Sequence, residues 1–417
     1  MMTNATRNKN LNTVIFTWLC IAFVYSLLFL TYLNSVLSVI LVLFWLFFLR
    51  KEFDLSSTKT MLMLLFMLLY VAGIAGMIYT NNTNAGWATL KTQSAIFFFP
   101  LLFGSTSFLT DPVLKKITNH FLIATSVACL SGFASGAYNY LQTGNPEELT
   151  GEHILVFHAF RPVSMGLFCL TAIILSFEKI STATIRGKNL LYTCILLMSL
   201  TVFLLSIRLI LVCWLLVMIY FFFKTIKRSS YRILLTAVTI LALIIAGFII
   251  PTAKKQWAEL FDFSESSTII LDKDSSLGKN WGGKALRVAI WKCSRDVLKK
   301  HWFIGVGTGD VQDSLQQAYQ RRKFYFASQY NRYNAHNEYL QITMANGLPG
   351  FMILLSCIIY PLRNYRKKFS GNTYFLFLLL FSVIGISESL LDVNKGIIWY
   401  SFFNSIFAFG YLKSKEI

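Results

Sequence analysis

The class of fold is decided by residues 189–223, NLLYTCILLMSLTVFLLSIRLILVCWLLVMIYFFF, which carry a single charged residue, Arg208. A helix needs about 20 apolar residues to cross the ~30 Å hydrocarbon core of a bilayer, and about 17 residues are the shortest run that suffices. A short break, Ser206 to Arg208, divides the stretch in two. The pattern predicts two membrane helices, 189–205 and 208–223, joined by a tight turn.

The whole chain shares this character. Of its 417 residues 55% are hydrophobic and only 14% are charged, whereas a soluble domain carries about 25% charged residues. The composition excludes a water-soluble globule and predicts an all-α polytopic membrane protein with about 12 transmembrane helices. The predicted spans are 13–30, 34–49, 60–79, 88–108, 117–138, 160–176, 189–205, 208–223, 233–250, 346–361, 372–390 and 397–412.

Basic residues are distributed unevenly over the segments between these spans. If the N-terminus is cytoplasmic, the inside segments hold 20 of the 38 basic residues, and the short outside connections hold almost none. Cytoplasmic loops of membrane proteins are enriched in Lys and Arg. We therefore expect both termini on the cytoplasmic side. The net charge of +19 is then a topology signal that needs no nucleic acid to explain it.

One outside segment is too long to be a simple connection. Residues 251–345 contain four tryptophans and the helix-like stretch KALRVAIWKCSRDVLKK at 284–300. Long translocated segments escape the charge bias, and we interpret this one as a folded cap over the outer mouth of the bundle. The predicted organisation is transmembrane helices 1–9 in residues 1–250, the cap in 251–345, and transmembrane helices 10–12 in residues 346–417.

Two arginines are candidates for function. Arg208 lies between two spans on the outer side, and it either snorkels to water or belongs to a site. Arg287 lies on the predicted cap helix 284–300, off its apolar stripe. Its face is either solvated or lies over the mouth of the bundle, where a guanidinium would bind a lipid diphosphate through forked N–H groups. The apolar stripe consists of Leu286, Ala289, Ile290, Cys293 and Val297.

Further polar residues lie at the outer ends of spans. His336 precedes the tenth span, where an imidazole is suited to general-base work near neutral pH, although a lone histidine there is more often structural. His158 and Arg161 either line a substrate mouth or stabilise the interface. Glu388 and Asp392 are candidates to pair with a cap arginine, and the sequence does not specify which one.

Two motifs are weaker than they look. Residues 272–274 read Asp-Lys-Asp, the metal-binding pattern of nucleotide-sugar transferases, but an outside loop has no access to cytoplasmic nucleotide sugars. Residues 305–309 read Gly-Val-Gly-Thr-Gly, without the Lys-Ser/Thr of a phosphate-binding loop. We predict a helix-connecting turn there. No acidic or Cys/His cluster predicts a metal site.

A longer pattern begins at His336. It reads His336-Asn337, nine residues, Gly347, two residues and Gly350, and it resembles the signature of the O-antigen ligase superfamily. This group comprises O-antigen ligases, the related polymerases and pilin O-oligosaccharyltransferases. The order of many spans, one large outside loop and a few closing spans is also similar. The resemblance is strongest over residues 200–350.

Two more elements carry the resemblance. The Ser206 to Arg208 turn is similar to the family's Ser-Arg element, with Ile207 inserted between the two residues as a departure. The run Arg287-Val-Ala-Ile-Trp, followed by the 305–309 turn, resembles its cap-helix segment and glycine turn. The chain looks most like an O-antigen ligase, because the histidine signature is tighter there than in polymerases.

The resemblance implies a fold like that of GT-C glycosyltransferases and a lipid-linked donor. The donor would be a glycan on undecaprenyl diphosphate at the periplasmic face of a Gram-negative inner membrane, and the acceptor a hydroxyl of lipid A–core. Arg208 and Arg287 would clamp the diphosphate, and His336 would orient or deprotonate the acceptor hydroxyl. Arg161 and Asn337 would add substrate contacts. The reaction would use no cofactor and no metal.

Other functions remain open on the sequence. An O-antigen polymerase would join lipid-linked repeat units with the same donor chemistry. A polysaccharide transporter or flippase would do no covalent chemistry, but such proteins often show internal repeats and charges at the midplane. A non-catalytic scaffold would use the cap for docking.

Overall fold

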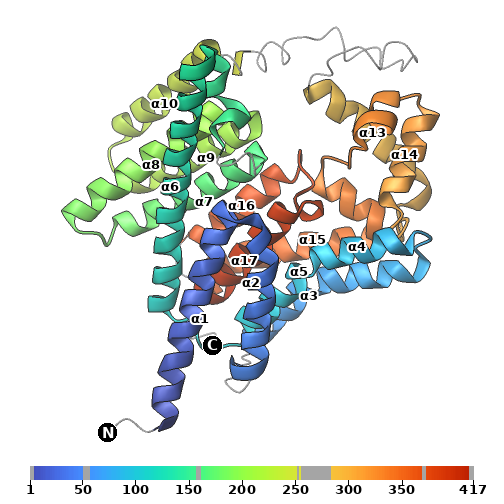
Figure 1. Ribbon diagram of the computed structural model, residues 1–417, viewed down its shortest axis with the longest axis horizontal. Coiled ribbons are helices and arrows are strands. Elements are labelled where there is room, and N and C mark those ends of the chain that lie inside the picture. The colour runs from blue at the N-terminus through green and yellow to red at the C-terminus, as the bar shows by residue number, and fades with distance from the viewer. Residues whose placement is uncertain are drawn as a thin grey trace.

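The computed structural model describes residues 4–49, 57–155, 161–250, 253–254, 283–368 and 372–412, and the regular elements in these ranges are helices (Figure 1). The bounds of the α-helices are α1 (Asn4–Phe29), α2 (Thr31–Phe44), α3 (Ser57–Gly76), α4 (Thr83–Gln93), α5 (Ala95–Gly104), α6 (Asp111–Thr143), α7 (Pro162–Ile180), α8 (Ile185–Leu205), α9 (Arg208–Thr225), α10 (Ser229–Ile249), α13 (Gly283–His301), α14 (Val311–Arg321), α15 (Glu338–Lys368), α16 (Thr373–Ile384) and α17 (Asn394–Gly410).

Eight helices in the described ranges are long and apolar enough to cross a membrane. They are α1, α3, α6, α7, α8, α9, α10 and α15. The chain is therefore an all-α polytopic membrane protein, as the composition predicts. The two spans predicted within residues 189–223 are the separate helices α8 and α9.

Four of the predicted spans differ from this pattern. Residues 34–49 fall on the short apolar helix Tyr32–Phe48. The predicted span 88–108 is divided at Ser94 into α4, which is polar, and α5, which is apolar.

The helices at the last two predicted spans are also outside this group of eight. The predicted span 372–390 is shortened to α16, which ends at Ile384 where the sequence changes from apolar residues to the polar run at 387–389. The span predicted at 397–412 is α17, a helix of 17 residues.

The centre of the bundle is formed by α7 and α17. Most residues of both helices are buried, and aromatic rings fill the space around them. The ring of Phe402 on α17, for example, packs against Phe23, Phe99 and Phe103. By contrast α10, at the edge of the bundle in Figure 1, exposes most of its apolar side chains, as a lipid-facing helix does.

The cap has a small core of its own in the residues that the structure describes. The apolar stripe predicted on 284–300 is confirmed, because α13 buries Ala289, Ile290, Cys293 and Val297 in a cluster shared with α14. Figure 1 shows α13 and α14 together at the end of the molecule opposite the start of α1.

The glycine-containing turn between α13 and α14 joins the cap to the bundle. The backbone N–H groups of Val306 and Gly307 donate to the carbonyl oxygens of Met344 and Ala345, at 2.7 and 3.1 Å. Gly305 and Gly307 have φ angles of 88° and 98°, which favour glycine. The predicted turn is confirmed, and its role is to pack closely against α15.

The partner of this turn is a bend in α15. Gly347 has φ 62° and ψ −158°, and a Cβ atom built there would lie 2.1 Å from the carbonyl oxygen of Phe303. The helix begins at Glu338, inside the segment predicted as cap, and the bend falls close to the predicted start of the tenth span. Only glycine allows the two backbones to approach this closely.

A buried carboxylate joins the cap to the connection between α3 and α4. Asp310 accepts hydrogen bonds from the backbone N–H groups of Asn81 and Asn82, both at 2.7 Å. Beside it, the hydroxyl of Thr308 donates to the carbonyl oxygen of Gly73 at 2.6 Å. We call residues 305–310 with these contacts the docking turn.

Candidate functional site

A cavity of about 540 Å³ lies where α7, α9 and the described part of α13 begin, and α16 ends. Both predicted arginines, Arg208 and Arg287, line it, together with Lys284 and the carboxylate of Glu388. Three cationic side chains against one carboxylate give the wall an excess of positive charge. We call this space the cationic cavity.

Arg208 is the first residue of α9, and the residues before it explain why the helix begins there. Ser206 ends α8 in the left-handed conformation, with φ 57°, and its hydroxyl donates to the carbonyl oxygen of Phe203 at 3.0 Å. Ile207 is extended and starts the new helix. Ser206 is buried and shapes the turn, while Arg208 is half-buried and lines the cavity.

The ends of two bundle helices add to the positive field. The cavity wall includes Pro162 and Val163 at the start of α7, and residues 207–210 at the start of α9. The first N–H groups of a helix have no partner within the helix, and this end carries roughly half a positive charge. A pocket of this kind, with arginines beside it, favours a phosphate-like anion.

Arg287 is held in place by three hydrogen bonds. Its Nε donates to the carbonyl oxygen of Ser387 at 3.1 Å, one terminal nitrogen to that of Gly283 at 3.3 Å, and the other to Oε1 of Glu388 at 2.6 Å. A guanidinium has five N–H donors. These bonds use three of them and fix the plane of the group, which leaves two donors for a ligand.

His336 stands in a strained backbone conformation next to the same carboxylate. Its φ angle is 43°, in the left-handed region that costs a non-glycine residue on the order of 1–3 kcal/mol. Its backbone N–H donates to Oδ1 of Asn334 at 3.1 Å, and the indole N–H of Trp291 donates to its carbonyl oxygen at 3.4 Å. Its Nδ1 lies 3.5 Å from Oε2 of Glu388, an ion-pair distance.

Glu388 therefore joins the cap helix to the histidine. One carboxylate oxygen accepts from Arg287 and the other faces His336. Burial raises the pKa of Glu388, but the approach of His336 and the charge of Arg287 outweigh burial and hold this pKa below its ordinary value. The carboxylate is ionised at neutral pH. The pairing with a cap arginine that the sequence left open is with Arg287.

Asp392, four residues later, lies in a different environment. Burial raises its pKa, and the hydrogen bonds from Asn334 and Gln341 only partly oppose this effect. The amide of Asn334 donates to its Oδ2 at 2.6 Å. Because Asn334 also accepts from the backbone N–H of His336, Asp392 supports the strained turn at His336. It does not line the cationic cavity.

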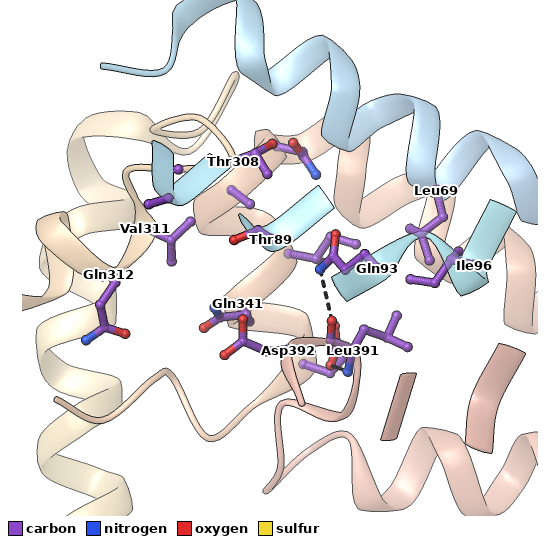
Figure 2. Close-up of a pocket in the computed structure, with 16 residues that line it drawn as sticks. Leu69, Thr89, Gln93, Ile96, Thr308, Val311, Gln312, Gln341, Leu391 and Asp392 are labelled. Atoms are coloured by element: carbon purple, nitrogen blue, oxygen red, sulfur yellow. Dashed lines mark hydrogen bonds between the residues drawn. The ribbon is translucent and has the colours of Figure 1, made fainter. Parts of the chain in front are cut away.

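Figure 2 shows the cavity that Asp392 does line, a smaller one of about 110 Å³. Asp392 and Gln341 lie side by side on its wall, and Gln93 of α4 donates to the carbonyl oxygen of Leu391 at 2.9 Å. The buried carboxylate of Glu338 accepts from the backbone N–H of Leu391 at 2.7 Å. These bonds fix the short helix η8 (Leu390–Asp392), and with it the segment that carries Glu388.

The other predicted site residues lie around this centre. Asn337 caps α15, since its Oδ1 accepts from the N–H of Leu340 at 2.9 Å and its Nδ2 donates to the carbonyl oxygen of Ile386 at 2.8 Å. Arg161 is exposed and directly precedes Pro162 at the cavity wall. His158 and the Asp-Lys-Asp run at 272–274 lie outside the described residues.

Sequence reasoning missed Lys284 and the double contact of Glu388. Lys284 is the second residue of α13, and its sequence neighbours give no sign that it lines a cavity. Glu388 stood out as an acidic residue near a span end, which was the one available signal. In the part of the chain that the structure describes, no three His, Cys, Asp or Glu side chains gather as metal ligands would.

Fold and site together define a polytopic membrane protein with a positively charged cavity between its bundle and a helical cap. Residues 193–355 match a family model described as O-antigen ligase, and this match supports the O-antigen ligase superfamily. The resemblance seen in the sequence motifs is confirmed. The matched region contains Arg208, Arg287 and His336. Members of the family are glycosyltransferase-like enzymes that act on lipid-linked glycans, and they include both ligases and polymerases. No curated protein matches the chain.

Proposed function

We propose that the protein is an O-antigen ligase. It transfers a glycan from undecaprenyl diphosphate to a sugar hydroxyl of lipid A–core at the periplasmic face of a bacterial inner membrane. The observation that carries the proposal is the cationic cavity, which Arg208, Arg287 and Lys284 line together with Glu388, whose other oxygen lies 3.5 Å from Nδ1 of His336. The charge bias of the connections supports both termini on the cytoplasmic side, with residues 251–345 as a periplasmic cap.

The donor diphosphate occupies the cationic cavity. Its oxygens accept the two remaining N–H groups of Arg287 and the guanidinium of Arg208, and the N-terminal ends of α7 and α9 add partial positive charge. Negative charge grows on the diphosphate as it leaves the anomeric carbon, so these groups stabilise the transition state more than the ground state. In this arrangement arginines supply the counter-charge that a metal supplies in other transferases.

His336 activates the acceptor. Glu388 at Nδ1 favours a proton on that nitrogen, so that Nε2 is free to accept the proton of the acceptor hydroxyl. The acceptor oxygen bonds to the anomeric carbon as the bond from this carbon to the diphosphate oxygen breaks. The electron pair leaves with undecaprenyl diphosphate, and the proton passes to the imidazole.

The test is complementation of a strain that lacks the protein. Lipopolysaccharide gels and extracted undecaprenyl-linked glycans are compared for the wild type and for His336→Ala, with His153→Ala as the matched control. His153 also pairs with a glutamate, Glu148 at 3.0 Å, but away from the cavity. We expect wild type and control to restore long glycans on the core, and His336→Ala to leave bare core with glycan accumulated on the lipid carrier.

Other outcomes separate the alternatives. Core with single repeat units in the null strain identifies a polymerase, and an unchanged ladder contradicts the whole family of functions. Full ligation by stably inserted His336→Ala excludes the role of the histidine.

The arginine fork is tested on the same helix. Arg287→Lys replaces the fork by a point charge, and we expect about a hundredfold loss of transfer. Arg295→Lys, on the exposed face of α13, is the control and is expected to keep wild-type transfer. Near-normal activity of Arg287→Lys would contradict the proposal that the guanidinium binds the diphosphate.

A further inference from the structure

Three large apolar side chains in a row point away from the protein directly after α13. Trp302, Phe303 and Ile304 are 57%, 58% and 56% exposed. They follow three exposed basic residues, Lys299 to His301, which form the last turn of the helix. A contiguous exposed apolar group marks a contact with another apolar phase or surface.

The backbone of this tripeptide is fixed to the end of one membrane helix and to the bend of another. The N–H of Leu348, just after the bend in α15, donates to the carbonyl oxygens of Trp302 and Phe303 at 2.9 and 3.1 Å. The hydroxyl of Tyr79, the last residue of the span that includes α3, donates to the carbonyl oxygen of Ile304 at 2.8 Å. The tripeptide therefore lies beside the end of the α3 span and the bend in α15.

The surface beside it is already lipid-facing. Ile78, next to Tyr79 at the end of its span, is 87% exposed, and Met352 on α15 is 52% exposed. Leu348 itself is also exposed. Since α3 and α15 pack against each other, the exposed side chains of the tripeptide continue an apolar surface that the spans present to the bilayer.

We propose that residues 299–304 are a membrane-interface anchor of the cap. Trp302, Phe303 and Ile304 insert among the lipid headgroups and upper acyl chains, as aromatic residues do at membrane–water boundaries. Lys299 and Lys300 lie above them and attract anionic headgroups. The occupant of this surface is the bilayer, because the exposed apolar side chains and the basic residues that precede them lie beside the end of a membrane span.

The anchor has a consequence for the distant end of the same helix. α13 is one continuous helix from Gly283 to His301, with Arg287 in its first turns and the anchor at its end. An anchor in the lipid fixes the height of α13 relative to the bilayer. It thereby holds Arg287 at a set distance from the plane in which a lipid diphosphate lies.

The test measures depth and needs no catalytic activity. Phe303→Cys carries a nitroxide label in nanodiscs of phosphatidylglycerol and phosphatidylcholine, one protein per disc, in a Cys194→Ala background. Cys194 is the one native cysteine that is not fully buried. Gln320→Cys, on the exposed face of α14, is the matched control. Oxygen partitions into lipid and a nickel chelate into water, so the ratio of their collision rates reports depth.

We expect the label at Phe303 to collide several times more often with oxygen than with nickel, and the label at Gln320 to show the reverse. Removing phosphatidylglycerol, or changing Lys299 and Lys300 together to Gln, is expected to shift Phe303 toward water. Equal nickel access at both sites would overturn the proposal. So would low access to both reagents at Phe303, which would place the tripeptide in a protein interface. Trp302→Cys repeats the measurement if Phe303→Cys inserts poorly.

Discussion

The cap meets the membrane bundle at two places that are built in opposite ways. The docking turn, residues 305–310, is joined by backbone hydrogen bonds and close glycine contacts. The contact through Arg287, Glu388 and His336 is made of charged side chains around a cavity of about 540 Å³. One contact fixes the cap, and the other leaves room for a ligand.

The difference explains why a single sequence signature contains such unlike residues. His336 belongs to the open contact, while Gly347, eleven positions later, belongs to the docking turn and lets Phe303 approach. The two lie at either end of the first turns of α15. The helix therefore transmits the position of the rigid contact to the reactive one, and each part of the comparison can be tested separately.

The largest effect is expected from Gly347→Ala. An added Cβ would lie 2.1 Å from the carbonyl oxygen of Phe303, and both neighbours are backbone and cannot move aside. We expect little folded protein in the membrane fraction, measured by detergent-resistant fluorescence of a fused reporter. Gly144→Ala is the comparison variant, since Gly144 has a φ of 66°, an ordinary left-handed α conformation with a ψ of 5°, and open space around it.

If the two variants accumulate equally, close packing at the docking turn is not what holds the cap.

The next effect, on the open contact, is expected from Glu388→Gln. The amide keeps the volume but removes the charge that orients Arg287 and favours the Nδ1 proton of His336. We expect transfer to fall on the order of a hundredfold, about 2.7 kcal/mol, with normal membrane insertion. Initial rates with a purified lipid-linked donor would measure it.

Glu148→Gln serves as its control, because Glu148 pairs with His153 outside the cavity. Equal rates for both variants would remove Glu388 from the mechanism. The lowered pKa of Glu388 adds a pH dependence, since the wild-type carboxylate stays ionised until the pH falls below the ordinary range for glutamate.

The contrast between the two contacts also separates what could be predicted from sequence. Hydropathy predicted the helical membrane fold, and an apolar stripe predicted the buried face of α13, because both patterns are local. Glycine spacing indicated the turn at 305–309. The span predicted at 372–390 is longer than α16, because hydropathy does not reveal where the chain leaves the helix to place Glu388.

The open contact was predicted only in part. Arg208, Arg287 and His336 were chosen from their positions and from a family resemblance, and the structure places the two arginines on one cavity. The partner of Arg287 could not be chosen, because Glu388 lies 101 positions away and two acidic residues had equal claims. Only the fold separates Glu388, facing the cationic cavity, from Asp392, which lines another.

A smaller effect is expected at the docking turn from Asp310→Asn. The carboxylate accepts two backbone N–H groups at 2.7 Å, and an amide would turn one N–H donor toward another. Hydrogen bonds to charged groups contribute about 1.5–3 kcal/mol each, so we expect a clear fall in the unfolding temperature of the protein in nanodiscs. Glu152→Gln, at an exposed residue outside the cap, is the control and should change it little.

Unchanged stability in Asp310→Asn would mean that backbone contacts alone hold the turn. A loss of transfer without a loss of stability would show instead that the docking turn affects the position of the residues around the cationic cavity.

The smallest effect is expected inside the cap, where neither contact is involved. Arg322 donates to both oxygens of Asp296, at 2.5 and 2.9 Å, and this bidentate bond holds the pKa of Asp296 below its ordinary value. Both side chains are partly exposed, so the pair contributes only about 0.2–1 kcal/mol. Because the folded pKa is depressed, this stabilisation is present above the unfolded pKa of about 3.9 and is lost as the pH falls through the folded value. Asp296→Asn should therefore unfold slightly earlier than wild type at pH 7, and the gap should close as the pH falls below the folded pKa of Asp296. A gap that persists in acid would assign the effect to packing of Arg322 rather than to its charge.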